Sequence, residues 1–85
     1  MTTFPLSIVT PNGVLLKEKV RFLSAPGVEG SFGILAGHAP FVTILTKGTL
    51  KVDLEETSRM FAIHEGIFEI NAQGQALVLT DRADE

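Results

Sequence analysis

Glycine and proline interrupt this sequence so often that few segments are long enough for a helix of three turns. The 85 residues include eight glycines and four prolines, and both residue types weaken or end helices. Between the interruptions lie short stretches rich in β-branched and aromatic residues, as strands require. We therefore predict an all-β fold, a two-sheet β-sandwich without a helical domain, in a single domain over residues 1–85.

The predicted strands follow hydrophobic patterns between turn signals. Leu50, Val52 and Leu54 alternate with charged residues, the period of a half-buried strand. Residues 41–45 form a continuous apolar run, which predicts a strand covered on both faces. Further strands are expected at residues 4–9, 14–16, 19–24, 59–64, 67–70 and 76–79, with a hairpin turn at Pro-Asn-Gly 11–13. The tail from residue 81 onward is polar.

Composition excludes several classes of function. With no cysteine, the chain has no disulfide, thiolate metal site or cysteine nucleophile. The two histidines, His38 and His64, are far apart in the sequence and have no partner at metal-ligand spacing. The net charge of −3 and seven scattered basic residues argue against a nucleic-acid partner. We expect no metal, no cofactor and no nucleic acid.

Motifs for membrane insertion and catalysis are also missing from the sequence. No apolar run approaches the roughly 20 residues that cross a bilayer, and the first five residues do not resemble a signal peptide. We therefore expect an intracellular chain without membrane insertion. No Gly-x-Ser-x-Gly or phosphate-binding glycine motif is present. Glu55, Glu56 and Glu65 fall at expected turns and are interpreted as solvated charges.

Residues 25–40 hold four glycines and two prolines, which predicts an irregular path. One interpretation is a chain of turns that links the two sheets and places Phe32, Ile34 and Leu35 in the core. The other is a rigid surface that presents Glu29 and His38 to a partner. The residues alone favour neither. A small enzyme or ligand-binding domain that uses His38 with Glu29 is an alternative function, as is a stand-alone adaptor.

The same segment resembles, almost position for position, a signature of the epsilon subunit of F-type ATP synthases, Pro-Gly-x-Glu-Gly-x-Phe-Gly-Ile/Val-Leu-x-Gly-His-Ala-Pro. Residues 4–13 (Phe-x-Leu-x-Ile-Val-Thr-Pro-x-Gly) resemble that family's first strand and turn. Residues 66–71 and 76–81 resemble its closing strands, so the resemblance covers nearly the whole chain. It implies the N-terminal β-sandwich of the family, with about ten short strands.

The resemblance implies a non-catalytic rotor subunit of a proton-translocating ATP synthase. Such a subunit joins the gamma subunit to the c ring in the central stalk and couples ion flow to ATP synthesis. The absence of cysteine and of a transit peptide favours a bacterial protein, peripheral on the cytoplasmic face of the inner membrane. By resemblance, the gamma-binding positions are Thr10, His38 and Thr43, the c-ring-binding positions are Glu29 and Ser31, and the positions that hold the loop in shape are Gly27, Gly30, Phe32, Gly33 and Pro40.

Two departures from the family pattern qualify the resemblance. Position 31 is often acidic in relatives, so Ser31 leaves Glu29 as the main charged contact to the c ring. Family members also continue into a pair of C-terminal helices that bind ATP or inhibit hydrolysis, whereas this sequence ends at Glu85. It is either a naturally short member or a trimmed chain. We expect no nucleotide binding by this polypeptide.

Overall fold

The computed structural model describes residues 2–85, and their regular structure consists of ten β-strands without a helix. No membrane-spanning helix is found in this part of the chain. The all-β prediction is confirmed. The strands are β1 Phe4–Thr10, β2 Gly13–Val20, β3 Phe22–Gly27, β4 Gly30–Leu35, β5 Phe41–Leu45, β6 Gly48–Asp53, β7 Ser58–Ile63, β8 Gly66–Ile70, β9 Ala76–Thr80 and β10 Ala83–Asp84.

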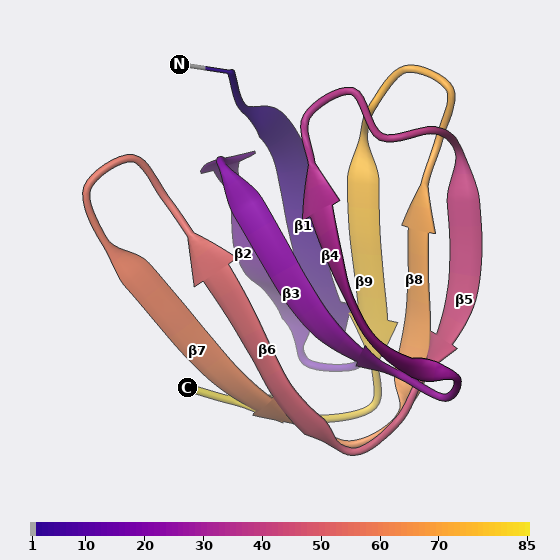
Figure 1. Cartoon of the computed structure of the whole chain (residues 1–85). Helices are drawn as coiled ribbons and strands as arrows, with labels where there is room; N and C mark the ends of the chain where they lie inside the picture. The colour runs from indigo at the N-terminus through magenta and orange to yellow at the C-terminus, as the bar shows by residue number, and fades with distance from the viewer. Residues whose placement is uncertain (1) are drawn as a thin grey trace.

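The strands form two layers that face each other (Figure 1). One layer contains β4, β3, β6 and β7, with β10 on the outer edge of β7, and the other contains β5, β8, β9, β1 and β2. All pairings are antiparallel except that of β1 with β9. The layers meet where β3 pairs with β5 at Gly27 and Leu45. The predicted sandwich is therefore a single sheet that curls over itself.

The core lies between the layers and is built by alternating residues of the strands. Its largest fully buried side chains include Phe61, Phe68 and Leu23. Burying each such side chain contributes about 1.5–3 kcal/mol. Thr80 is the one buried polar residue among those described, and its hydroxyl donates a hydrogen bond to the Glu65 carbonyl oxygen at 2.8 Å. The interior is thus apolar, as the alternating pattern predicts.

The segment over residues 25–40 is more regular than its composition predicts. β3 extends to Gly27, and residues 30–35 form β4, which pairs with β3 along its whole length. Gly30, with φ +123°, follows the two-residue turn between these strands. Only residues 36–40 are irregular. The glycines permit the tight turn and a close approach of the strands, and they do not interrupt the pairing.

Two expectations about hydrophobic side chains were wrong. One of the two interpretations of residues 25–40 places Leu35 in the core with Phe32 and Ile34, but Leu35 is 60% exposed because β4 alternates and turns Ile34 inward. β5 was expected to be covered on both faces, yet Val42 and Ile44 are 65% and 59% exposed. Nothing in residues 2–85 covers the outer face of β5.

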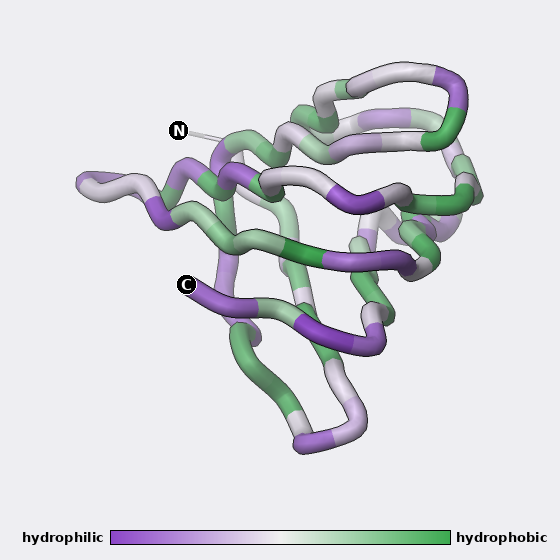
Figure 2. Tube along the Cα trace, turned by 90° about the horizontal axis from the view of Figure 1, so that it is seen from below, coloured by the Kyte–Doolittle hydropathy of each residue, from purple (hydrophilic) through white to green (hydrophobic). Residues whose placement is uncertain are grey.

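The polar tail adds a short strand that the sequence did not predict. Ala83 and Asp84 of β10 pair with Ile63 and Ala62 of β7, although this C-terminal segment is mostly hydrophilic (Figure 2). Arg59 of β7 reinforces the pairing, because its guanidinium donates hydrogen bonds of 2.7 and 2.6 Å to the two carboxylate oxygens of Glu85. β10 thus protects the edge of the first layer.

Candidate functional site

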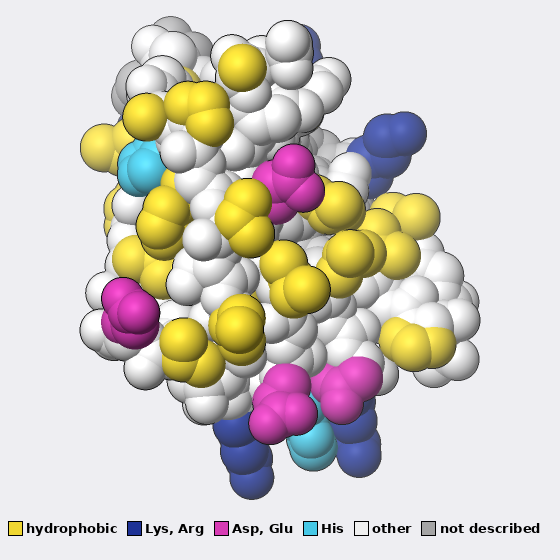
Figure 3. All heavy atoms as spheres, turned by 90° about the vertical axis from the view of Figure 1, so that its right-hand side faces the viewer, with side chains coloured by type: hydrophobic (Ala, Val, Ile, Leu, Met, Phe, Trp, Pro, Cys, Tyr) yellow, Lys and Arg dark blue, Asp and Glu magenta, His cyan; other side chains and the backbone are white. Residues whose placement is uncertain are grey.

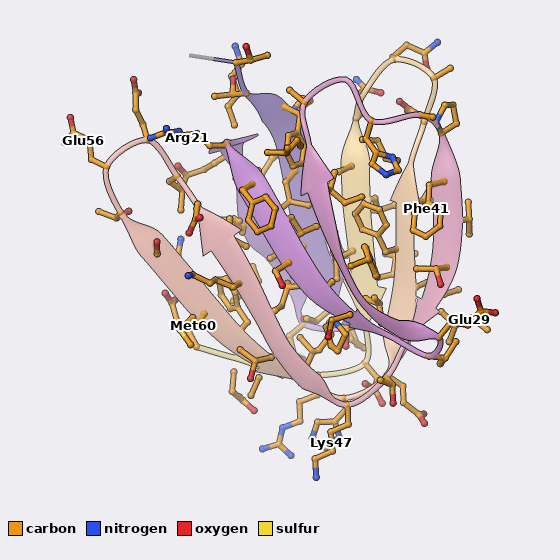
Figure 4. The ribbon with its side chains drawn as sticks, in the orientation of Figure 1. Arg21, Glu29, Phe41, Lys47, Glu56 and Met60 are labelled. Carbon is orange, nitrogen blue, oxygen red and sulfur yellow. The ribbon has the colours of Figure 1, made fainter. Side chains whose placement is uncertain are left out.

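The connections between strands gather at two ends of the molecule, because the chain runs alternately up and down (Figure 1). The lower end holds the β1–β2, β3–β4, β5–β6, β7–β8 and β9–β10 connections, and the upper end holds the others. Figure 4 labels Glu29 and Lys47 at the lower end and Arg21 and Glu56 at the upper end. Each loop residue singled out from the sequence can be assigned to one end.

Glu29 and His38 lie at opposite ends of β4. Glu29 is in the turn that precedes this strand, and His38 is in the connection that follows it. Six extended residues separate the two ends by about 20 Å at roughly 3.3 Å per residue. A carboxylate and an imidazole at this separation cannot act on one substrate. The alternative of an enzyme that uses His38 with Glu29 is therefore not supported.

The two predicted c-ring-binding positions are close together near the lower end. Glu29 is exposed in the β3–β4 turn, and Ser31 is exposed on β4 opposite Pro26. No ion pair involves Glu29 within the described chain. Lys47 in the β5–β6 connection also lies at this end (Figure 4). The lower end thus presents charges of both signs.

The three predicted gamma-binding positions do not form one cluster. His38 is exposed at the upper end, Thr43 is half-buried on β5 opposite Phe68, and Thr10 ends β1 at the lower end. The Thr10 hydroxyl accepts a hydrogen bond from the Asn12 amide at 3.2 Å. Thr10 therefore has a local role in the first hairpin turn as well.

Aromatic rings fill the open side between β4 and β5, the edge strands of the two layers. Phe32 lies 5.5 Å from Phe41 and 5.4 Å from Phe68, measured between ring centroids. The His38 ring lies 5.7 Å from that of Phe41, and its Nδ1 is 2.6 Å from the Ala39 carbonyl oxygen, to which it donates. His38 thus covers the upper end of this aromatic cluster.

Two glycines of the predicted loop set leave no room for a side chain. A Cβ on Gly27 would lie 2.9 Å from the Gly30 carbonyl oxygen and 3.1 Å from the Phe32 ring. A Cβ on Gly33 would lie 2.9 Å from the Phe22 ring, which occupies the space beside it. Pro40 lies directly before β5. This close packing around Gly27 and Gly33 is what a shape-holding role requires.

The most extensive candidate surface was not singled out from the sequence. Ile44, Ile67 and Leu79 are in register across β5, β8 and β9, and Leu79 is in register with Val9 of β1. The first three are 59%, 47% and 44% exposed, and Val14, paired with Val9, is 62% exposed. We call these five residues the apolar row. Figure 3 shows hydrophobic side chains gathered across this side of the molecule.

The sequence does carry a signal for this surface. In residues 41–45 and 76–79 nearly every position is apolar, so both faces of these strands are hydrophobic. That pattern is shared by strands that are buried on both sides and by strands whose outer face is covered only when a partner protein binds. Only the arrangement of the strands distinguishes the two cases.

The chemistry available to these surfaces is that of binding. Over residues 2–85, no group of three or more His, Asp or Glu side chains is close enough to hold a metal ion. Contiguous exposed apolar residues bordered by polar ones are typical of a protein–protein interface. The apolar row and the charged lower end are the candidate sites.

Comparison with known sequences points to one family. The model of the ATP synthase delta/epsilon chain β-sandwich domain matches residues 3–85. The ATP synthase epsilon chain of Aliarcobacter butzleri is 38% identical over 71 residues, which are 84% of this chain and 57% of the relative. The ATP synthase epsilon chain 2 of Nitrobacter hamburgensis is 37% identical over 83 residues, which are 98% of this chain and 60% of the relative. The ATP synthase epsilon chain of Caulobacter vibrioides is 36% identical over 78 residues, which are 92% of this chain and 91% of the relative. The chain thus spans about 60% of the first two relatives and most of the third.

Solved structures agree with this assignment. A chain in the Euglena gracilis mitochondrial ATP synthase, in a structure of OSCP, F1 and the c ring, superposes with a TM-score of 0.92 at 27% identity and covers 99% of this chain and 54% of its own length. A chain in the Tetrahymena thermophila central stalk and c-ring structure gives a TM-score of 0.85 over 95% of this chain and 65% of its own length, at 17% identity, and supports the fold alone.

Proposed function

Because the chain belongs to the ATP synthase delta/epsilon chain β-sandwich family, we propose that it is a non-catalytic subunit of the central stalk that joins the gamma subunit to the c ring. In this role it transmits rotation and so couples ion flow to ATP synthesis. It contributes no catalytic residue and binds no nucleotide. It is peripheral, on the cytoplasmic face of a bacterial inner membrane, in a proton-translocating complex.

The apolar row is the observation that carries this proposal. Ile44, Ile67 and Leu79 lie side by side on the outer face of one layer, exposed to solvent in the isolated chain. Removing apolar surface from water favours association by about 25 cal/mol per Å². Such a face fits permanent attachment to a neighbouring subunit, and we assign gamma to it. Thr10 follows Val9 at the end of β1, whereas Thr43 and His38 lie beside Phe68 and Phe41 on the other side of β5, so their assignment to gamma rests on the resemblance.

The lower end is assigned to the c ring. Glu29 is exposed there without an ion pair among the described residues, and Ser31 follows it on β4. A carboxylate at the tip of a hairpin is available to a basic residue of a c-subunit loop. A contact through one charge is weaker than the apolar contact with gamma. The chain is therefore bound mainly by gamma, and its contact with the c ring is the weaker of the two.

Torque transmission requires a body that does not deform between its two contacts. The curled sheet meets this need because the two layers share one hydrogen-bonded network through Gly27 and Leu45. The core between them has no buried side-chain polar atom without a partner in the described chain. A close-packed interior of this kind resists shear.

Reconstitution tests the proposal directly. The chain is mixed with the cognate gamma subunit and co-purified, and the complex is then assembled with the remaining subunits. ATP hydrolysis and proton pumping are compared with and without the chain. Stoichiometric binding and restored pumping are expected. Binding without any change in pumping would favour a stand-alone adaptor, and absence of gamma binding would refute the proposal.

A further inference from the structure

Glu69 lies on the same outer face as the apolar row, one row closer to the upper end. It is exposed on β8 between Val42 of β5 and Leu77 of β9, with which it is in register. Ile67, two residues earlier on β8, points to the same side. No hydrogen bond or ion pair of the Glu69 side chain occurs within residues 2–85. The carboxylate is thus flanked by apolar side chains and has no partner among the described residues.

The two lysines that share a groove with Glu69 form no ion pair with it. Lys17 and Lys19 line the far side of a shallow groove that Glu69 also borders. The register places Leu77 of β9 and Ser7 of β1 between Glu69 and Lys17 of β2. Three strand spacings of about 4.8 Å separate the backbones of the two residues by roughly 14 Å. An ion pair within the chain would need the two charges within about 4 Å.

A partner that covered this face with apolar residues alone would remove water from Glu69 without replacing its hydrogen bonds. Desolvating an unpaired carboxylate is strongly unfavourable, whereas pairing it with a cation recovers much of the loss. Charge complementarity therefore defines the partner surface. We propose that the protein covering the apolar row brings an arginine or lysine side chain against Glu69.

This inference rests on the proposed function, because it takes gamma to be that protein. It adds a specificity determinant to an interface that is otherwise hydrophobic. Apolar contact gives affinity but little discrimination, since any hydrophobic patch of suitable shape can form it. A carboxylate within the contact rejects surfaces that lack a cation and fixes the position of those that carry one.

Substitution of Glu69 by leucine distinguishes a cationic partner from an apolar one by the direction of the change. Affinity of the full chain for the cognate gamma subunit is measured by calorimetry for wild type, Glu69→Leu and Glu69→Gln. If gamma brings a cation, Glu69→Leu leaves that cation buried and unpaired, and binding weakens by at least about 30-fold. Glu69→Gln weakens it as well. If the opposing surface is apolar, Glu69→Leu binds as tightly as wild type or more tightly, and the inference is overturned.

A matched control uses another exposed glutamate. Glu56→Leu, in the β6–β7 connection at the upper end (Figure 4), makes the same chemical change away from the face and is expected to leave gamma affinity unchanged. Thermal unfolding of each variant verifies that the fold is intact. Failure of wild type to bind gamma would overturn the proposed function and this inference together. Retained wild-type binding with tighter binding by Glu69→Leu would overturn the inference alone.

Discussion

Phe32 of β4 meets Phe41 of β5 edge to face, with ring centroids 5.5 Å apart and an interplanar angle of 72°. The two strands are edges of different layers. Among the described residues, Gly27 and Leu45 are the one pair in register between β3 and β5, with hydrogen bonds from the Val28 and Thr46 amides to the Ile44 and Pro26 carbonyl oxygens. Contact between the rings therefore holds together a side of the sandwich that few hydrogen bonds close. Edge-to-face geometry is the arrangement that the quadrupoles of the rings favour.

Replacing Phe32 by alanine is expected to destabilise the domain by about 2–4 kcal/mol. Fully buried phenylalanines lose about 3–5 kcal/mol in this substitution, and Phe32 is only partly buried. Denaturant unfolding measures the change, and Phe32→Leu serves as a control with a smaller loss. An unchanged unfolding midpoint for Phe32→Ala would mean that the aromatic cluster does not hold the two layers together.

Replacing Ile44 by aspartate is expected to abolish gamma binding and leave the fold intact. The side chain is 59% exposed, so the charge is tolerated in the free chain, but it becomes buried when a partner covers the apolar row. Binding is measured with purified gamma, and circular dichroism monitors the fold. Met60→Asp on the other layer, where Met60 is 56% exposed, is the matched control. Equal loss of binding in both variants would argue against a specific role for the row.

Replacing His38 by alanine is expected to weaken gamma binding by several fold with little effect on stability. The ring is exposed and contacts Phe41 at 5.7 Å, so its removal deprives the fold of little buried area. Calorimetry with gamma gives the affinity. His64→Ala, at the lower end, is the control. If His38→Ala binds gamma like wild type, the gamma-facing assignment of this position is incorrect.

Replacing Gly66 by alanine is expected to destabilise the domain by about 1–3 kcal/mol or more, as overpacking does. A Cβ at this position would collide with the Leu79 carbonyl oxygen and lie 3.0 Å from the Thr80 Cα, both of which belong to the neighbouring strand backbone. The backbone of β9 cannot move aside without breaking its pairing with β8. The melting temperature reports the loss. Ile67→Ala, beside it on the exposed face, should have a much smaller effect.

Acid is expected to weaken the attachment of β10 to β7. The hydrogen bonds from Arg59 lower the pKa of Glu85 below its ordinary value. A lowered pKa in the folded state contributes stability above the unfolded-state pKa, and this contribution is lost as the pH falls through the folded-state pKa. Glu85→Gln should therefore melt below wild type at neutral pH, and the difference should shrink under strongly acidic conditions. A difference that stays constant with pH would exclude this ion pair as its source.

The strands were predictable because their signals are local. Alternation at Leu50, Val52 and Leu54 placed β6 within two residues of its observed bounds, and the glycine and proline signals placed most turns. β4 and β10 were missed for a shared reason. Gly30 and Gly33 mask the alternation of β4, and the polar β10 depends on its pairing with β7. Pairing between strands distant in sequence is not encoded in either segment alone.

By itself, the sequence determined that this protein is an all-β sandwich with a dense apolar core, since side-chain period and turn chemistry act over a few residues. Only the tertiary structure decided which apolar residues lie outside the core and are exposed. Val42 and Ile44 look like core residues in the sequence, and they are exposed because β5 lies at the edge of a layer whose outer face no described residue covers. The same arrangement placed Glu29 and His38 at opposite ends of β4 and Glu69 beside an apolar row. Exposure and proximity depend on how distant strands stack, and that is a property of the assembled fold.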